Sequence, residues 1–175
     1  MQCGGHHRRR DRSLAARRAA GGRGFHPPGE RGARGIAPVF TPNAYTRRMD
    51  ETPDYTLEIQ IATRFLPEES APEDDRYVFA YTIRIRNLGR RAAQLLDRHW
   101  LITDGNGHVE EVRGEGVVGE QPLIEPGDQF TYTSGAVLET AVGTMEGSYG
   151  MVGDDGTHFD APIPPFTLAV PRTLH

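Results

Sequence analysis

The chain of 175 residues contains no lysine, one cysteine and no long hydrophobic run. Cys3 has no second cysteine to pair with, so neither an intrachain disulfide nor a cysteine-based zinc site can form. No window approaches the 18 consecutive apolar residues expected of a membrane-spanning helix, so no membrane span is predicted. The fold must therefore depend on a hydrophobic core alone.

The cationic residues are all arginine, and they are distributed unevenly. Residues 1–48 carry 11 arginines against Asp11 and Glu30, a net charge of +9, whereas residues 49–175 have a net charge of −13. Such an asymmetry is typical of a basic tail on an acidic domain. The 21 glycines and 13 prolines favour a turn-rich domain over a helical bundle.

Residues 1–48 are predicted to be a disordered Arg/Gly-rich extension, because their large apolar side chains are too sparse to form a core. Three interpretations stay open: a nucleic-acid-binding arm, an inert extension, or a segment that is not translated because Met49 is the true start. The arginines precede no apolar stretch of the kind found in secretory or twin-arginine signals. A cytoplasmic location is predicted.

From Tyr55 onward, apolar residues alternate with polar ones, which indicates antiparallel strands with one buried face. The pattern predicts strands over 55–62 and 77–86, separated by an acidic loop at Pro67–Asp75. A third strand over about Gln94–Asp104 is expected to bury three side chains, namely those of Leu96, Trp100 and Ile102.

Tight turns are predicted at three short segments rich in Gly, Asp and Asn. They are 104–107 (DGNG), 126–128 (PGD) and 154–156 (DDG). Between and after them, strands are expected over 108–113, around 130–132, over 145–151 and over 159–168. Pro164-Pro165 cannot donate ladder hydrogen bonds, so the last strand should be an edge strand, bulged or broken. Residues 49–175 are thus predicted to form an all-β, two-sheet sandwich of about seven to nine antiparallel strands.

The most suggestive motif is G-x-G-x-x-G, formed by Gly114, Gly116 and Gly119. Prolines shortly after it forbid the helix that a dinucleotide-binding motif opens, so the motif does not predict a nucleotide-dependent oxidoreductase. Two interpretations remain: a tight loop between strands, or a nest of amides that holds a phosphate-type anion. In the second, Arg90, Arg91 or Arg98 could approach from neighbouring strands. The candidate anion-binding residues are Arg113, Gly114, Glu115, Gly116, Val117, Val118 and Gly119.

Other chemistry has weaker support in the sequence. Asp104, Asn106, His108 and Glu115 distantly resemble a calcium loop but lack its sixth-position glycine, and Asp154–Asp160 forms a second acidic turn. His99 is expected on the face opposite Trp100, and Ser134 lacks a nucleophile-elbow motif. No catalytic residue, metal site or cofactor is therefore predicted, and the protein is not expected to be an enzyme. The alternative is a metal-responsive protein or metal-dependent hydrolase that uses the two turns.

Several spaced motifs closely resemble the ApaG family, also called CorD, over essentially residues 52–170. They are the runs His99–Asp104 (HWLITD), Val112–Pro122 (VRGEGVVGEQP), Phe130–Gly135 (FTYTSG), Met145–Met151 (MEGSYGM) and Ile163–Phe166 (IPPF). Residues 1–48 have no counterpart in the family, which favours a start at Met49 or a lineage-specific extension.

The resemblance implies an immunoglobulin-like or fibronectin type III-like β-sandwich and no established enzymatic activity. It also implies an association with cobalt resistance and magnesium efflux, and a domain that binds a protein partner or ligand. The family's glycine motif, carried here by Gly114, Gly116 and Gly119, suggests a pyrophosphate-like anion. The oligomeric state is left open by the sequence.

Overall fold

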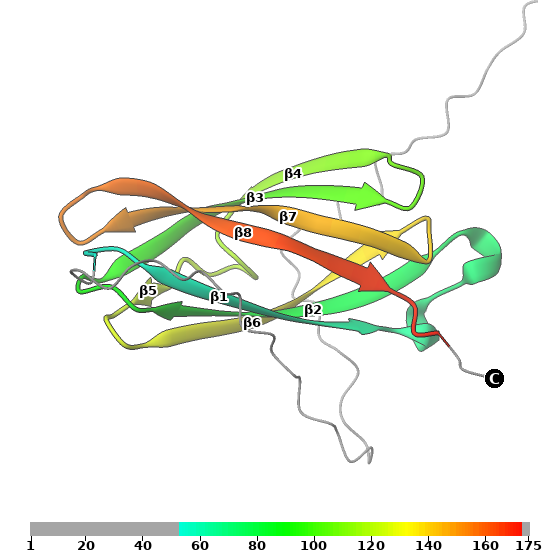
Figure 1. Ribbon diagram of the computed structural model, residues 1–175, viewed down its shortest axis with the longest axis horizontal. Coiled ribbons are helices and arrows are strands. Elements are labelled where there is room, and N and C mark those ends of the chain that lie inside the picture. The colour runs from blue at the N-terminus through cyan, green and yellow to red at the C-terminus, as the bar shows by residue number, and fades with distance from the viewer. Residues whose placement is uncertain (1–52, 173–175) are drawn as a thin grey trace, which may run out of the picture.

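The computed structural model describes residues 53–172, which form two antiparallel β-sheets packed face to face (Figure 1). One sheet has the strand order β1-β2-β6, and the other has the order β4-β3-β7-β8, with β5 also paired to β3. The elements are β1 (Leu57–Phe65), η1 (Pro67–Glu69), η2 (Pro72–Asp74), β2 (Tyr77–Asn87), β3 (Ala93–Asp104), β4 (Val109–Glu115), β5 (Leu123–Ile124), β6 (Gln129–Leu138), β7 (Val142–Gly153) and β8 (His158–Ala169). The predicted all-β sandwich is confirmed. The predicted tail, residues 1–48, lies outside the described residues.

The inward faces of both sheets form one hydrophobic core. Ile83 and Ile85 of β2, Trp100 of β3 and Tyr149 of β7 are almost completely buried in it. The rings of Tyr81, Tyr149 and Phe166 surround Trp100 in edge-on contacts, with centroids 5.7–6.3 Å from its own. The alternation in the sequence correctly predicted these inward faces, because successive side chains of a strand point to opposite sides.

One predicted core position in β3 is wrong. Trp100 and Ile102 are buried as expected, but Leu95 is fully buried, whereas Leu96 is only half-buried. The pairing of β3 with β7 shifts between Leu95 and Asp97, so Leu96 is the extra residue of a β-bulge. A bulge reverses the inward and outward alternation on one side of it, so the prediction failed at Leu96 and held at Trp100 and Ile102.

The acidic stretch Pro67–Asp75 is more structured than the predicted loop. It contains the two short 3-10 helices, each beginning with proline. Leu66 enters this segment and forms a small second cluster with Val78 and Ala80 of β2 and Val137 of β6. Val78, Ala80 and Val137 belong to the outer face of the three-stranded sheet, so Leu66 covers part of that face and β2 is buried on both sides there.

The prediction for the last strand is confirmed. β8 is an edge strand, and its pairing with β7 contains a register shift. Met145 pairs with Phe166 and Gly147 pairs with Ile163, so one residue of β7 lies opposite two residues of β8. The extra residue therefore falls at Pro164-Pro165, where no ladder amide is available. Within residues 53–172 there is no helix long and apolar enough to cross a membrane.

Candidate functional site

The loop that carries the glycine motif leaves the end of β4 and lies beside the bulge in β3. The amide of Gly116 donates to the carbonyl of Leu96 (2.8 Å), and the amide of Leu95 donates to the carbonyl of Pro122 (3.0 Å). Val117 is inserted into the main core and is 1% exposed. The loop is therefore packed against the sandwich and fills the interval between β4 and β5 along the edge of β3.

The tip of this loop is a tight hairpin turn. Val117 and Glu120 exchange two backbone hydrogen bonds, of 2.8 and 2.9 Å. Between them, Val118 and Gly119 have φ values of +44° and +80°. Positive φ at both central positions is the type I′ geometry, in which Asn and Gly are preferred. Val118 is β-branched and sits in a region that such residues rarely adopt.

Two of the three motif glycines have a local steric reason. A Cβ on Gly114 would lie 2.9 Å from the guanidinium of Arg98, and a Cβ on Gly116, at φ +58°, would lie 2.4 Å from the carbonyl oxygen of Glu120. Gly119 faces open space, and only its φ of +80° favours glycine. The glycines are thus required by the shape of the loop itself.

Three amides of the Gly114–Gly119 motif, and that of Glu120 beside it, already have acceptors. Those of Gly116, Val117 and Glu120 donate to backbone carbonyls, and the alternation of the β3–β4 ladder turns the Gly114 amide toward β3. Within residues 53–172, the amides of Val118 and Gly119 donate to no acceptor. An anion at this loop would therefore meet the two tip amides, not a continuous nest.

Of the arginines considered for the site, only Arg98 reaches the loop. Its Nη1 donates to the carbonyls of Glu115 (2.9 Å) and Gly116 (2.6 Å), which fixes the base of the loop. Arg113 is directed to Glu111, with its Nη2 2.8 Å from Oε1. The same oxygen lies 2.8 Å from Nε2 of His99, which faces away from the core as predicted. Arg113 and His99 together lower the pKa of Glu111.

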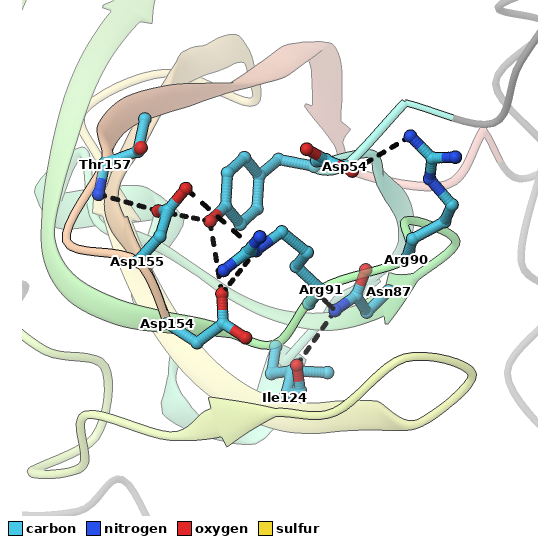
Figure 2. A network of polar contacts seen from close by, with 9 residues as sticks. Asp54, Asn87, Arg90, Arg91, Ile124, Asp154, Asp155 and Thr157 are labelled. Atoms are coloured by element: carbon cyan, nitrogen blue, oxygen red, sulfur yellow. Dashed lines mark hydrogen bonds and ion pairs between the residues drawn. The ribbon is translucent and has the colours of Figure 1, made fainter.

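Arg90 and Arg91 belong to a different place, the end of the sandwich where β1 begins and β7 turns into β8 (Figure 2). Nη2 of Arg90 lies 3.1 Å from Asp54, and Nε of Arg91 lies 2.7 Å from Asp154. Tyr55 completes the network, since its hydroxyl donates to both Asp154 and Asp155. Sequence reasoning missed this network because its members come from segments 36 and 100 residues apart.

Asn87 is the buried polar residue beside this network (Figure 2). Its Nδ2 donates to the carbonyls of Arg91 (2.8 Å) and Ile124 (2.9 Å), and its Oδ1 accepts from the amide of Gly89 (2.9 Å). A side chain that satisfies three backbone groups, two in the loop between β2 and β3 and one in β5, joins these segments and has a structural role. No sequence motif predicts that the side chain of Asn87 has this structural role.

The two acidic turns proposed for the alternative metal site are far apart. Asp104 pairs with Gly143 and Ala93 with Gly153, so the turns at 104–107 and 154–156 lie at opposite ends of β3 and β7, separated by about 35 Å of strand. Oδ1 of Asp104 accepts the amides of Asn106 and His108, as in an ordinary turn. Residues 53–172 contain no group of three His, Cys, Asp or Glu side chains placed to hold a metal ion.

A cluster of tyrosines lies inside the sandwich, near Arg98. The hydroxyls of Tyr132 and Tyr149 are hydrogen-bonded to each other, and Ser134 lies beside Tyr81. Burial raises the pKa of all three phenols, so they are neutral at physiological pH. They contribute hydrogen bonds to the core and carry no charge that would activate a substrate.

The fold and the site define a small all-β sandwich. In its Gly114–Gly119 loop, hydrogen bonds hold the base against β3, whereas the amides at the tip donate to no acceptor within residues 53–172. A family model described as the ApaG domain matches residues 67–153. The protein ApaG of Dechloromonas aromatica strain RCB is 61% identical over 127 residues, which are 73% of this chain and 100% of the relative. The protein ApaG of Stenotrophomonas maltophilia strain K279a is 60% identical over the same length, with the same coverage.

Solved structures agree with these sequence matches. A crystal structure of a Bordetella pertussis protein named ApaA superposes with a TM-score of 0.68 and 52% identity, covering 70% of this chain and 100% of that one. The chain belongs to the ApaG family, as the resemblance in the sequence indicated. The matched relatives carry the name protein ApaG and no enzyme name.

Proposed function

We propose that this domain is a cytoplasmic, non-catalytic binding module that contacts a protein partner through the tip of the Gly114–Gly119 loop. The observation that carries the proposal is Val118, an apolar β-branched residue held at φ +44° and 40% exposed. Strain of this kind is typically about 1–3 kcal/mol and gathers at functional positions. The core gains little from a side chain that is so exposed, whereas a partner would gain an apolar contact on a rigid support.

A photo-crosslinking residue placed at position 118 of the full chain tests this proposal in cells. We expect a discrete protein adduct from position 118, and none from position 142. Val142 is a matched control because it is also an exposed valine, 47% exposed, and it lies at the start of β7, away from the loop. Equal labelling from both positions, or labelling from neither, would contradict the proposal.

A phosphate-type anion such as pyrophosphate is the second candidate ligand. The supporting observation is the pair of amides at Val118 and Gly119 that donate to no acceptor within residues 53–172. Pyrophosphate titrated against the labelled protein should shift these two amide resonances first. Unchanged tip amides at millimolar pyrophosphate would discard the anion.

In this proposal, the domain is connected with cobalt resistance and magnesium efflux because it binds a protein partner, and not because it binds either metal ion itself. The described residues hold no three-ligand group, and the carboxylate of Asp104 is already engaged by amides. Equilibrium dialysis against cobalt and magnesium should find no stoichiometric binding. Binding that disappears in Asp154→Ala would instead support the metal-dependent alternative.

A further inference from the structure

The four outer strands of the two sheets are not equally protected against pairing with another strand. β8 contains Pro162, Pro164 and Pro165, which cannot donate to a new neighbour. β4 has four charged residues among seven, and charges on an edge discourage pairing. β1 lies against β8 on one side of the sandwich and carries Glu58 and Arg64.

β6 has none of these protections. Its ten residues, QFTYTSGAVL, include no proline and no charged residue. On one side it pairs with β2 over its whole length, and within residues 53–172 no strand pairs with its other side. A long, neutral, unpaired edge is the typical template for adding a further strand.

The pairing register identifies the backbone groups that face this open edge. The amide of Asn87 donates to the carbonyl of Asp128, and bonded pairs alternate along an antiparallel ladder. The even-numbered residues of β6 therefore bond to β2. The N–H and C=O groups of the odd-numbered residues face outward, at Gln129, Thr131, Thr133, Gly135 and Val137.

The sequence of β6 is complementary to itself. If two copies pair antiparallel about a two-fold axis at Thr133, bulky residues of the first half meet small residues of the second. Phe130 then lies opposite Ala136, and Tyr132 lies opposite Ser134. Within each chain, Thr133 already forms a 2.8 Å hydroxyl hydrogen bond with Thr82 of β2, so the axis would join two such pairs into a row of four threonines.

The charges near β6 are compatible with the same pairing. Arg84 is the β2 neighbour of Thr131, and on the other copy the row would continue through Gly135 to Ala80. Arg84 of one copy is therefore not in the same row as Arg84 of the other copy. The flanking Glu139 would meet Gly127 under the same register, so no like charges are placed together.

We propose that two copies of this chain associate through β6, antiparallel about Thr133, so that the two three-stranded sheets become one six-stranded sheet. This inference is independent of the loop function proposed above. A two-fold contact of this kind is closed, so it predicts dimers and no larger species.

Sedimentation equilibrium of the full chain tests the dimer. We expect twice the mass of one chain, and a dissociation constant at least about tenfold weaker for Thr131→Lys, because the two-fold axis brings a new cation in each copy close to β6 of the other. Thr131→Val is the matched variant that stays neutral, and it should still dimerise. Val109→Lys places the same charge on the β4 edge and should have no effect.

Amide hydrogen exchange gives a second readout, which does not depend on a variant. Raising the protein concentration should slow exchange at Thr131, Thr133 and Gly135, and should leave the outward amides of β4 unchanged. A wild-type chain that stays monomeric at millimolar concentration would overturn the proposal. So would a Thr131→Lys chain that remains folded and associates as tightly as wild type.

Discussion

The hydroxyl of Tyr55 is hydrogen-bonded to Oδ1 of Asp155, which lies 100 residues further along the chain. The ring of Tyr55 stacks on Phe159 with centroids 4.9 Å apart, and its hydroxyl occupies the space that a Cβ on Gly153 would need. This contact fastens the segment before β1 to the turn between β7 and β8, two parts that no backbone ladder joins within the described residues.

The Tyr55–Asp155 contact predicts a specific loss of stability in acid. The hydrogen bond from Tyr55, followed by that from the Thr157 amide, lowers the pKa of Asp155 to about 2 from 3.8. A carboxyl with a lowered pKa stabilises the fold above its unfolded pKa, and this contribution is lost as pH falls from about 4 to about 2. Urea unfolding at stepped pH should show a shallower decline in this window for Asp155→Asn than for wild type. Equal slopes for the two proteins would contradict this role.

The bulge at Leu96 predicts unequal effects from two adjacent leucines. Leu95→Ala should lower the free energy of unfolding by about 2–5 kcal/mol, because the side chain is fully buried. Leu96→Ala should lower it by about 1 kcal/mol or less, because that side chain is partly exposed. Chemical denaturation of both variants measures the difference. A larger loss of unfolding free energy for Leu96→Ala than for Leu95→Ala would contradict the bulge and support the uninterrupted alternation predicted from the sequence.

The strained turn predicts a stabilising substitution. Val118→Asn should raise the free energy of unfolding by about 1 kcal/mol, because Asn tolerates the left-handed region better than a β-branched residue. Gly116→Ala should destabilise more than Gly119→Ala, since only the first adds a clash with the Glu120 carbonyl. Thermal and urea unfolding measure all three. A destabilised Val118→Asn protein would mean that the valine side chain stabilises the fold itself.

Asn87 is predicted to be the most sensitive polar residue of the fold. Asn87→Ala leaves the Gly89 amide and the carbonyls of Arg91 and Ile124 without their partner in a buried place, a loss of about 3 kcal/mol or more. Asn106→Ala is the control, since Asn106 lies in an exposed turn and should change stability by about 0.5 kcal/mol at most. The two variants can be compared by urea denaturation.

The fragment 49–175 should fold and unfold with the same midpoint as the full chain. The residues of both hydrophobic clusters lie between Tyr55 and Val170, and so do the described strands. Circular dichroism melting of the two proteins makes the comparison. A lower midpoint for the fragment would show that residues 1–48 contribute to the stability of the domain.

Much of the fold could be predicted from the sequence because strand alternation is local. Tyr81, Ile83 and Ile85 of β2, and Tyr149 and Met151 of β7, are buried as their spacing indicated. The outer-face positions Val78 and Ala80 were not recognised, because the segment that covers them folds back from another part of the chain. Coverage of a face depends on tertiary contacts and leaves no periodic signal.

The candidate site divides in the same way. The sequence identified the glycine loop correctly as a feature between strands, and it excluded a helix there through its prolines. Which amides are already bonded depends on the bulge at Leu96 and on the register of β3 and β4, and neither is visible in the motif. The four candidate arginines were separated for the same reason, since only Arg98 lies on the face of β3 that reaches the loop.

The sequence by itself determined that this protein is an all-β sandwich with one glycine loop and edge positions marked by proline, because these follow from side-chain period and backbone chemistry. Only the tertiary structure decided that the loop is closed at its base, that Tyr55 fastens the segment before β1 to the turn between β7 and β8, and that no strand within residues 53–172 pairs with the outer edge of β6. Those properties depend on which segments far apart in the sequence contact one another, and these tertiary contacts are determined by how the whole chain packs.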